Sequence, residues 1–348
     1  MRILMVGDMH VTVDELEDAG QAVLLVKQIV EDHRPDVVVF MGDQHHNHAV
    51  VRIEVVDFWE RALQELCFAG MKRNAIFMLV GNHDRSTNQA LEMNSLVYDC
   101  NIIRRLASVC IVPRPYKHVS VDDPNWPSSV YLMPWIPDTQ FAEAIKDIPD
   151  GAVLLCHQTF NGAQYETGFY APDGVDPKLV ARFSKVFSGH IHKPQSFGNI
   201  HYIGAPRWRL MSDANEERAI VLFDTETNVA QYFDTGEYCT PIFKIADHES
   251  GAGVFPPAYL KHLKGKSPER GKKYVDIVGT AEYCEKRKFF WEQQNFSVAT
   301  FPARPKVEAV SEAKGVMQAL QTHLDEFVPP FGTPLETLKK MVSERIHV

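Results

Sequence analysis

Short runs of branched apolar residues alternate with helically spaced apolar positions along the first third of the chain. Residues 2–6, 36–40 and 76–80 are predicted to be buried strands, because each is a short and continuous apolar run. Between them, residues 14–33 and 53–69 place their apolar side chains on one face of a helix. This order of strands and helices predicts parallel strands joined by helical crossovers.

The following segment carries shorter and less regular strand patterns. The expected strands are 108–113, 118–121, 130–134, 152–156, 185–188, 201–203 and 219–223. A turn is expected at residues 224–228, which are rich in polar turn-forming residues. The predicted fold class is therefore α/β, with a mixed sheet that has antiparallel additions.

The pattern changes near residue 240 and predicts a second, smaller unit. Three strands and one helix are enough for a small α+β domain, and we expect them at 241–246, 274–278, 282–293 (the helix) and 296–301. Two helices are expected beyond it, the second capped by Thr333 with Pro334 at its first position. The expected domains are 1–238, a capping domain at 239–305 and a C-terminal helix pair at 306–348.

The composition is that of a globular protein with about two domains, at 348 residues, 45% hydrophobic and 23% charged. A net charge of −9 argues against a broadly basic surface, although residues 261–273 form a local basic strip. Six cysteines without a Cys-x-x-Cys pair are expected to be reduced thiols, which favours the cytoplasm. Neither a signal peptide nor a membrane-spanning run is expected.

Polar residues follow directly where five of the predicted strands end. In chain order these strand ends supply Asp8, His10, Asp43, Asn82, His157, His190 and His192. In α/β sheets the crevice beyond the carboxyl ends of the strands is where ligands bind. Oxygen and imidazole donors without thiolate suit a catalytic pair of manganese, iron or zinc ions. A pair of metals needs a bridging carboxylate, and Asp43, in the middle of the series, is the best candidate.

Each of these segments alone has an ordinary structural explanation. Asp8 can cap the helix that follows, and His157 can be a hydrogen-bonded core histidine. Five such segments, each after an apolar strand, favour a metal site instead. A site of this kind clamps a phosphate between two cations and activates a water. Cys156, next to His157, is expected to be a buried and inert thiol.

Five ordered motifs within residues 1–195 resemble those of the calcineurin-like metallophosphoesterase superfamily. They are Asp8-x-His10, Gly42-Asp43, Gly81-Asn82-His83-Asp84, His157 and Gly189-His190-x-His192. The resemblance implies a mixed β-sandwich flanked by helices. It also implies two metal ions, one held by Asp8, His10, Asp43 and His192 and the other by Asp43, Asn82, His157 and His190. It makes His83 a catalytic residue that protonates the leaving oxygen or stabilises the transition state, with Asp84 orienting it.

Further features resemble the DNA-end nuclease branch, the SbcD and meiotic-recombination-eleven family. Gly42-Asp43-Gln44-His45-His46 is similar to that branch's Gly-Asp-x-x-His, which makes His46 an additional active-site histidine. The segment Tyr202-Ile-Gly-Ala-Pro206 and the residues after it resemble the end of that nuclease domain. The small capping domain and the helix pair also match, and the length is closest to phage recombination nuclease subunits.

This resemblance implies a manganese-dependent nuclease subunit that acts in DNA recombination and repair. The expected activities are 3′→5′ exonuclease on duplex ends and endonuclease on single strands. A homodimer is expected, and residues 306–348 would grip the coiled-coil root of an SbcC-type ATPase partner. The side chains nearest the cleft in sequence that are suited to binding DNA phosphates are Arg85, Lys193, Arg207 and Arg209.

The basic residues 261–273 and 286–288 are a second candidate for contacting the DNA backbone, with a solvated surface as the simpler explanation. Two other functions remain open. One is a phosphoesterase for small substrates, such as a cyclic nucleotide or a phosphoprotein. The other is a non-catalytic scaffold with the same fold, which loss of ligand residues would mark, and none is lost here.

Overall fold

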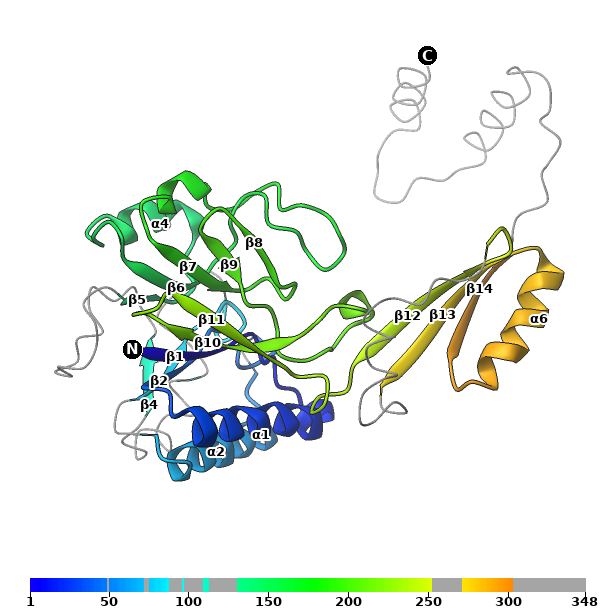
Figure 1. The fold of residues 1–348 in the computed structure, drawn as a ribbon, viewed down its shortest axis with the longest axis horizontal. Coiled ribbons are helices and arrows are strands. Elements are labelled where there is room, and N and C mark those ends of the chain that lie inside the picture. The colour runs from blue at the N-terminus through cyan, green and yellow to red at the C-terminus, as the bar shows by residue number, and fades with distance from the viewer. Residues whose placement is uncertain are drawn as a thin grey trace, which may run out of the picture.

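Two β-sheets face each other, and a third, smaller sheet lies beside them (Figure 1). The structure is a computed structural model, and it describes residues 1–48, 50–71, 75–87, 96, 109–112, 130–251 and 271–302. None of the helices within these ranges is long and apolar enough to cross a bilayer.

The first sheet has six strands in the order β11-β10-β1-β2-β3-β4. Its parallel part consists of β1 (Arg2–Val6), β2 (Val37–Phe40), β3 (Ile76–Leu79) and β4 (Val109–Val112). Its antiparallel part consists of β10 (Ala219–Asp224) and β11 (Val229–Asp234). Of these parallel strands, β2 and β3 are fully buried and β1 almost fully, because helices cover one face and the second sheet covers the other.

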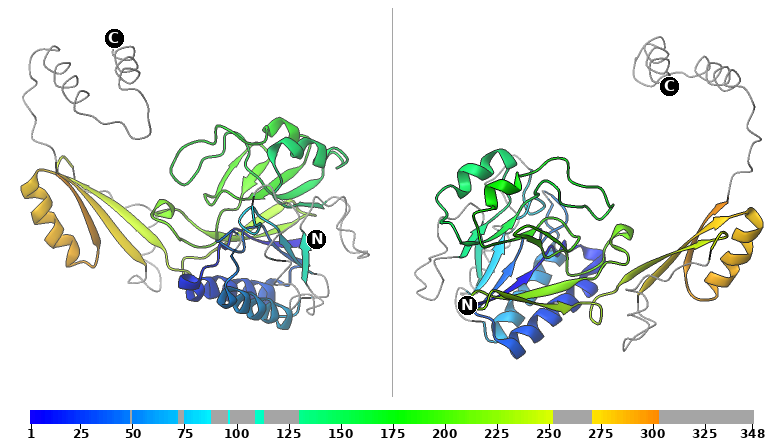
Figure 2. Two further views of the ribbon diagram at one scale, coloured as in Figure 1. Left: turned by 180° about the vertical axis from the view of Figure 1, so that it is seen from behind. Right: turned by 45° about the horizontal axis from the view of Figure 1, so that its top comes forward.

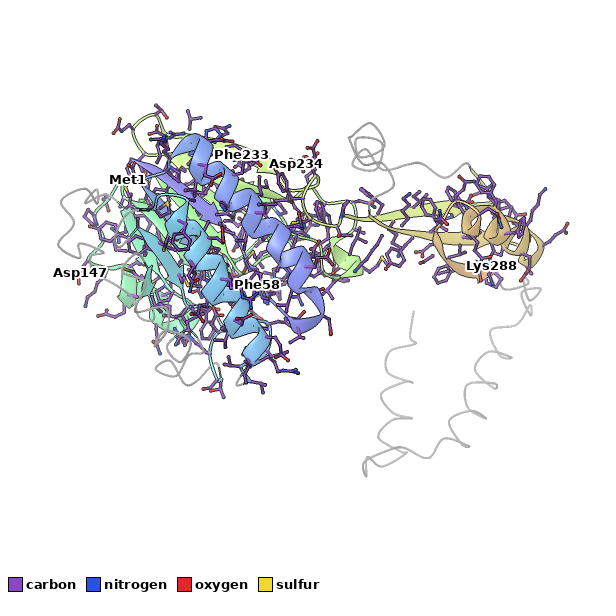
Figure 3. All side chains as sticks on the ribbon, turned by 90° about the horizontal axis from the view of Figure 1, so that it is seen from below. Met1, Phe58, Asp147, Phe233, Asp234 and Lys288 are labelled. Atoms are coloured by element: carbon purple, nitrogen blue, oxygen red, sulfur yellow. The ribbon has the colours of Figure 1, made fainter. Side chains whose placement is uncertain are left out.

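Two helices cover the outer face of this sheet, α1 (Leu16–His33) and α2 (Ile53–Phe68), and Figure 3 shows them side by side across it. The short 3₁₀ helix η1 (Val13–Glu15) leads into α1. Helix α1 ends where Arg34 takes a left-handed conformation (φ 48°) and its N–H donates to the Val30 carbonyl oxygen. The predicted helices and crossovers of this half are confirmed.

The second sheet has five strands in the order β5-β6-β7-β9-β8. They are β5 (Val130–Met133), β6 (Val153–His157), β7 (Lys185–Gly189), β8 (Gln195–Phe197) and β9 (Ile200–Tyr202). Its inner face joins the core of the first sheet, whereas its outer face packs under α4 (Asp138–Ile145). The 3₁₀ helices η2 (Pro177–Val180) and η3 (Met211–Asp213) lie in later loops. The expected mixed β-sandwich is confirmed.

The third sheet is parallel and has its own apolar core under one helix. It consists of β12 (Ile242–His248), β13 (Lys272–Gly279) and β14 (Ser297–Pro302), with α6 (Ala281–Glu292) packed on it. The buried Asp247 carboxylate accepts hydrogen bonds from Tyr283, Arg287 and Trp291 and so fastens the helix to β12. Both views in Figure 2 show this unit to one side of the sandwich.

Besides the short 3₁₀ helices η2 and η3, the sequence patterns missed α4, β8 and β11. The turn expected at 224–228 does connect β10 to a partner strand, but that partner, β11, has too few buried positions to show a strand pattern. The strand expected at 118–121, the helix pair at 306–348 and most of the basic strip at 261–273 lie outside the described residues.

Candidate metal centre

The segments that follow β1, β2, β3, β6 and β7 converge, and they bring all seven predicted ligands together. The backbone makes the first connection, because His10 N–H donates to the Asp43 carbonyl oxygen at 2.8 Å. Val11 N–H likewise donates to the backbone carbonyl oxygen of Gln44 at 2.9 Å. The parallel strands therefore deliver their terminal side chains to one place from both sheets of the sandwich.

Asp8, His10 and His192 form one group, in which the three ligand atoms lie within 4.8 Å of one another. The Nε2 atoms of His10 and His192 are only 2.9 Å apart. Two ring nitrogens this close can be neighbouring ligands of the same cation.

Asp43, His157 and His190 form the second group within the same limit of 4.8 Å. The Asn82 amide oxygen joins them, at 3.2 Å from His157 Nε2 and 2.8 Å from His190 Nδ1. One atom links the two groups, because Asp43 Oδ2 lies 3.3 Å from His10 Nε2 and 3.4 Å from His157 Nε2. This is the position that a bridging carboxylate requires.

Contacts outside these groups fix which ring nitrogen of two histidines carries the proton. His157 Nδ1–H donates to the Met41 carbonyl oxygen at 2.8 Å, which leaves Nε2 with its lone pair toward Asp43 when the ring is neutral. Arg209 Nη1 donates to His46 Nδ1 at 3.3 Å, so that nitrogen is an acceptor. His10 Nδ1 lies 3.4 Å from the same atom and can contact it only as a donor, and that tautomer leaves the lone pair of His10 on Nε2.

The backbone is strained at three of the candidate ligands. His10 (φ 42°), Asp43 (φ 51°) and His190 (φ 77°) adopt left-handed conformations, which cost side-chain-bearing residues free energy. Gly81 lets the chain approach this region closely, because a Cβ there would lie 2.1 Å from Asp43 Oδ1. Strain of this kind gathers at functional sites, where surrounding contacts enforce it.

The electrostatics hold two of the candidate ligand imidazoles neutral, those of His10 and His190. Desolvation lowers the pKa of His10 well below its ordinary value, and desolvation together with His157 lowers the pKa of His190 to about 3. His157 is the exception: although burial opposes its charge, Asp43 and Asp8 raise its pKa to about 9. Burial raises the pKa of Cys156 to about 12, so its thiol stays protonated as expected.

The residues fit a pair of divalent cations. Asp8 Oδ2 is buried and has no hydrogen-bond partner among the described residues, which leaves an acceptor for a cation. The donor set combines carboxylate and amide oxygens with imidazole nitrogens, as manganese, iron and zinc prefer. Clustered lone pairs and buried carboxylates repel one another, and a cation between them removes that repulsion.

His83 and His46 lie at the edge of the centre. His83 Nδ1–H donates to the His46 carbonyl oxygen at 2.6 Å, and its ring lies against those of His10 and His48. The resemblance gave Asp84 the task of orienting His83, but the Asp84 carboxylate accepts from the backbone N–H groups of His45 and Gly81, both at 2.9 Å. The His46 carbonyl fixes the His83 ring, and Asp84 fastens two loops of the centre.

Two of the four expected phosphate-binding side chains are used internally. Arg207 has no exposed surface, and its guanidinium donates to the carbonyl oxygens of Met9 and His10, both at 3.0 Å. Arg85 is buried as well and donates to the Trp135 carbonyl oxygen at 2.8 Å. The expectation that these two side chains bind phosphate is therefore wrong, because neither is exposed to a ligand.

The other two cations lie nearer the surface. Arg209 is 7% exposed and pairs with Glu15 at 2.9 Å, so its guanidinium serves the His46 contact rather than an open groove. Lys193 follows His192 directly and is partly exposed, with Nζ 2.9 Å from Gln164 Oε1 and 3.3 Å from Glu216 Oε1. Of the four, Lys193 alone keeps a position suited to binding a phosphate.

Three residues to which the sequence analysis gave no role support the centre. Glu166 Oε1 accepts from His192 N–H at 2.6 Å, and the buried Arg218 donates to the His192 carbonyl oxygen. Glu15 holds Arg209. None of them lies at the end of a predicted strand, so the pattern that revealed the ligands gave no signal for them.

Comparison with known proteins gives independent matches. The sequence model of the calcineurin-like phosphoesterase family matches residues 1–194. The chain is 24% identical over 239 residues to exonuclease subunit 1 of Enterobacteria phage T4, across 67% of each protein. It is 30% identical over 210 residues to a putative phosphoesterase of Invertebrate iridescent virus 3, across 58% of this chain and 56% of that one.

Among solved structures, one described as a novel archaeal phosphodiesterase matches 67% of this chain and 99% of its own, with a TM-score of 0.33 and 14% identity.

Proposed function

Because the chain belongs to the calcineurin-like phosphoesterase family of metal-dependent hydrolases, we propose that it is a nuclease that cuts phosphodiester bonds in DNA. One observation supports this most directly. Asp43 Oδ2 lies between His10 and His157, at 3.3 and 3.4 Å, and so joins the two groups of candidate ligands. The similarity to a phage exonuclease subunit favours DNA as the substrate.

The family uses a dinuclear metal centre, and we propose manganese as the metal. Asp8, His10, Asp43 and His192 would hold one ion, and Asp43, Asn82, His157 and His190 the other. When bound, such a pair neutralises charge on the phosphate and activates a water. Asn82 adds a neutral donor, which limits the negative charge that faces an anionic substrate.

The remaining proposed roles belong to side chains around these ligands. His83 donates from Nδ1 to the His46 carbonyl, so its Nε2 is the atom that would hold the proton passed to the leaving sugar oxygen. His46, whose pKa burial and Arg209 lower to about 4, stays neutral and positions His10 and His83. Asp84 would keep the loops of Gly81 and His45 in place.

We further propose the reactions and partners that the DNA-end nuclease branch implies. These are 3′→5′ exonuclease on duplex ends, endonuclease on single strands, a homodimer and an SbcC-type ATPase partner bound through residues 306–348. Deletion of residues 306–348 would abolish partner binding in a pull-down with the purified ATPase, while hydrolysis of a small phosphodiester continues. Unchanged binding would contradict the role given to this segment.

The direct test is cleavage by the purified protein with manganese at low salt. Duplexes with defined ends, a single-stranded oligonucleotide and bis-p-nitrophenyl phosphate would be compared side by side. We expect all three to be hydrolysed, with Asp43→Asn inactive on each and His83→Ala impaired most where the leaving group needs a proton. Hydrolysis of the nitrophenyl ester without cleavage of any DNA would favour the second candidate, a phosphoesterase for small substrates, to which the viral phosphoesterase relative also points.

A further inference from the structure

Two neighbouring aromatic residues stand exposed on the loop between β6 and β7. Phe169 is 76% exposed and Tyr170 is 68% exposed. Single exposed aromatic residues are common on soluble proteins, but two consecutive exposed aromatic residues on one loop place more apolar ring surface in water than an isolated one does. Neither ring contributes to the apolar cores of the described residues, so folding does not explain their presence.

The loop that carries them is ordered by its own hydrogen bonds. Tyr165 N–H donates to the Phe169 carbonyl oxygen at 2.8 Å, and Ala171 N–H donates to Ala163 at 2.7 Å. The Gln164 side chain donates to the Gly168 carbonyl oxygen at 2.8 Å and closes the tip. The two rings are therefore held on a formed turn, which lowers the entropy lost when they bind a ligand.

The same turn is tied to the candidate metal centre. Glu166, three residues before Phe169, accepts the His192 N–H at 2.6 Å. Tyr170 is four residues from Glu166, and four residues of chain span at most roughly 14 Å. Tyr170 therefore lies within a few nucleotide lengths of His192, the candidate metal ligand that Glu166 contacts. Lys193, next to His192, reaches Gln164 at the base of the turn and adds a cation beside it.

We propose that Phe169 and Tyr170 form a stacking site for unpaired nucleobases of the strand that enters the centre. This inference rests on the proposed nuclease function and specifies the form of its substrate: a single strand, or a duplex end that has opened. Every base has an aromatic face, so stacking binds a strand without regard to its sequence.

The charge of the chain favours binding of the strand by base stacking over binding by electrostatic attraction alone. The net charge is −9, and Arg85, Arg207 and Arg209 are engaged within the protein. A source of affinity besides phosphate neutralisation therefore suits this chain. Two exposed rings beside the centre supply it, and they discriminate between paired and unpaired bases because bases in a duplex already stack on each other.

The test compares Phe169→Ala/Tyr170→Ala with Phe169→Tyr/Tyr170→Phe, which keeps both aromatic faces. Phe68→Ala, at the end of α2 where the ring is 83% exposed, is the matched control. Binding of a single-stranded oligonucleotide would be measured by anisotropy in the metal-free protein. A 2-aminopurine base near the end of the strand reports stacking directly by its quenched fluorescence.

We expect the double alanine variant to bind the single strand at least about tenfold more weakly, and to lose the quenching. Its KM for the single strand would rise by a similar factor, whereas its rate of hydrolysis of bis-p-nitrophenyl phosphate would stay within about twofold of the wild-type rate. This contrast is expected of residues that touch only the bases, because the small ester has none. The aromatic exchange variant and Phe68→Ala would behave as the wild type.

Wild-type binding and quenching by the double alanine variant would overturn the stacking site and leave the nuclease function standing. A changed sedimentation coefficient in that variant would show that the rings contact a second copy of the chain, which also overturns the proposal. A wild-type protein that hydrolyses the nitrophenyl ester but neither binds nor cuts DNA would instead refute the proposed function, and the stacking site with it.

Discussion

At the scale of single residues, proton positions decide whether the candidate ligands are ready for a metal. The Met41 carbonyl fixes Nδ1–H on His157, and the Arg209–His46 contact does the same for His10. Both arrangements leave Nε2 toward Asp43. Contacts of this kind, made behind the ligand, orient metal-binding histidines and raise their basicity.

His157 predicts how metal affinity depends on pH. Its pKa of about 9 means that, at neutral pH, the His157 ring of the metal-free protein is protonated on both nitrogens and carries a positive charge. Manganese must displace that proton, so affinity should rise roughly tenfold per pH unit below pH 9 and level off above it. Calorimetric titrations in buffers of different ionisation enthalpy measure the proton release, and no release at pH 7 would contradict this.

The raised pKa of His157 also makes the stability of the metal-free protein depend on pH, and this stability falls as pH rises. The contribution of protonated His157 is fully present below the ordinary histidine pKa of about 6.5 and disappears as pH rises through about 9. Metal binding and metal-free stability therefore have opposite pH dependence.

Arg209 should raise the affinity for manganese without contacting the metal, because it acts through His46 and His10. In Arg209→Met, His46 loses its donor and His10 is no longer held in one tautomer. We expect manganese affinity to fall by about 10- to 100-fold, the usual cost of removing such support. Arg61→Met, at a solvent-exposed ion pair on α2, is the control. Equal manganese affinity in Arg209→Met and the control would contradict the role of Arg209.

At the scale of elements, the close approach of strand ends sets the geometry of the centre. Gly81 and Gly42 each lie two residues beyond the end of a strand, β3 and β2 respectively, and a Cβ at Gly42 would lie 2.2 Å from His157 Nδ1. Larger residues at these positions would push β-strand ends apart and separate the ligands that they carry.

Gly81→Ala should therefore abolish activity with little loss of secondary structure, since the added methyl displaces Asp43. Gly20→Ala is the matched control, and it should make the protein more stable. Gly20 lies in α1 with open space around its Cβ position, and alanine there should stabilise the helix by up to about 1 kcal/mol. Thermal melts and phosphodiesterase rates check both, and an active Gly81→Ala protein would refute the packing argument.

The sequence predicted the elements whose signal is a continuous buried run or an amphipathic stripe. It missed β11, which is exposed along most of its length, and α4 and β8, which are short. The convergence of the candidate ligands was predictable because parallel strands bring their carboxyl ends to one edge of a sheet. The supporting contacts were not, because Glu166, Arg218 and Glu15 reach the centre from loops and a 3₁₀ helix that folding alone places there.

The residues expected from the sequence to bind phosphate show the same limit. Arg207 and Lys193 are both cations near the last motifs, and nothing in their sequence context separates them. Burial does: Arg207 points inward to the carbonyl oxygens of Met9 and His10, and Lys193 stays partly exposed. Side-chain direction depends on the finished fold, so sequence proximity to a motif is a weak guide to substrate contact.

At the scale of the whole molecule, the centre couples the two sheets of the sandwich. Asp8, Asp43 and Asn82 follow strands of the first sheet. In the second sheet His157 is the last residue of β6, and His190 and His192 follow β7. A metal held by both sets would link them, so metal binding should stabilise the sandwich as a unit.

Manganese at about a hundred times its dissociation constant should raise the free energy of unfolding by about 2.7 kcal/mol per bound ion. The midpoint of thermal unfolding should rise accordingly and fall again with chelator. Asp43→Asn should cancel most of the increase, because the variant lacks the carboxylate that both ions share. An equal increase in the variant would show that the stabilising ions bind elsewhere.

The account depends on the shared position of Asp43, and anomalous diffraction from manganese-soaked crystals tests it most directly. Two anomalous peaks a few ångströms apart are expected on either side of the Asp43 carboxylate, one beside His10 and His192 and one beside His157 and His190. Peaks at other places, or the seven side chains turned away from one another around a single weak peak, would contradict it.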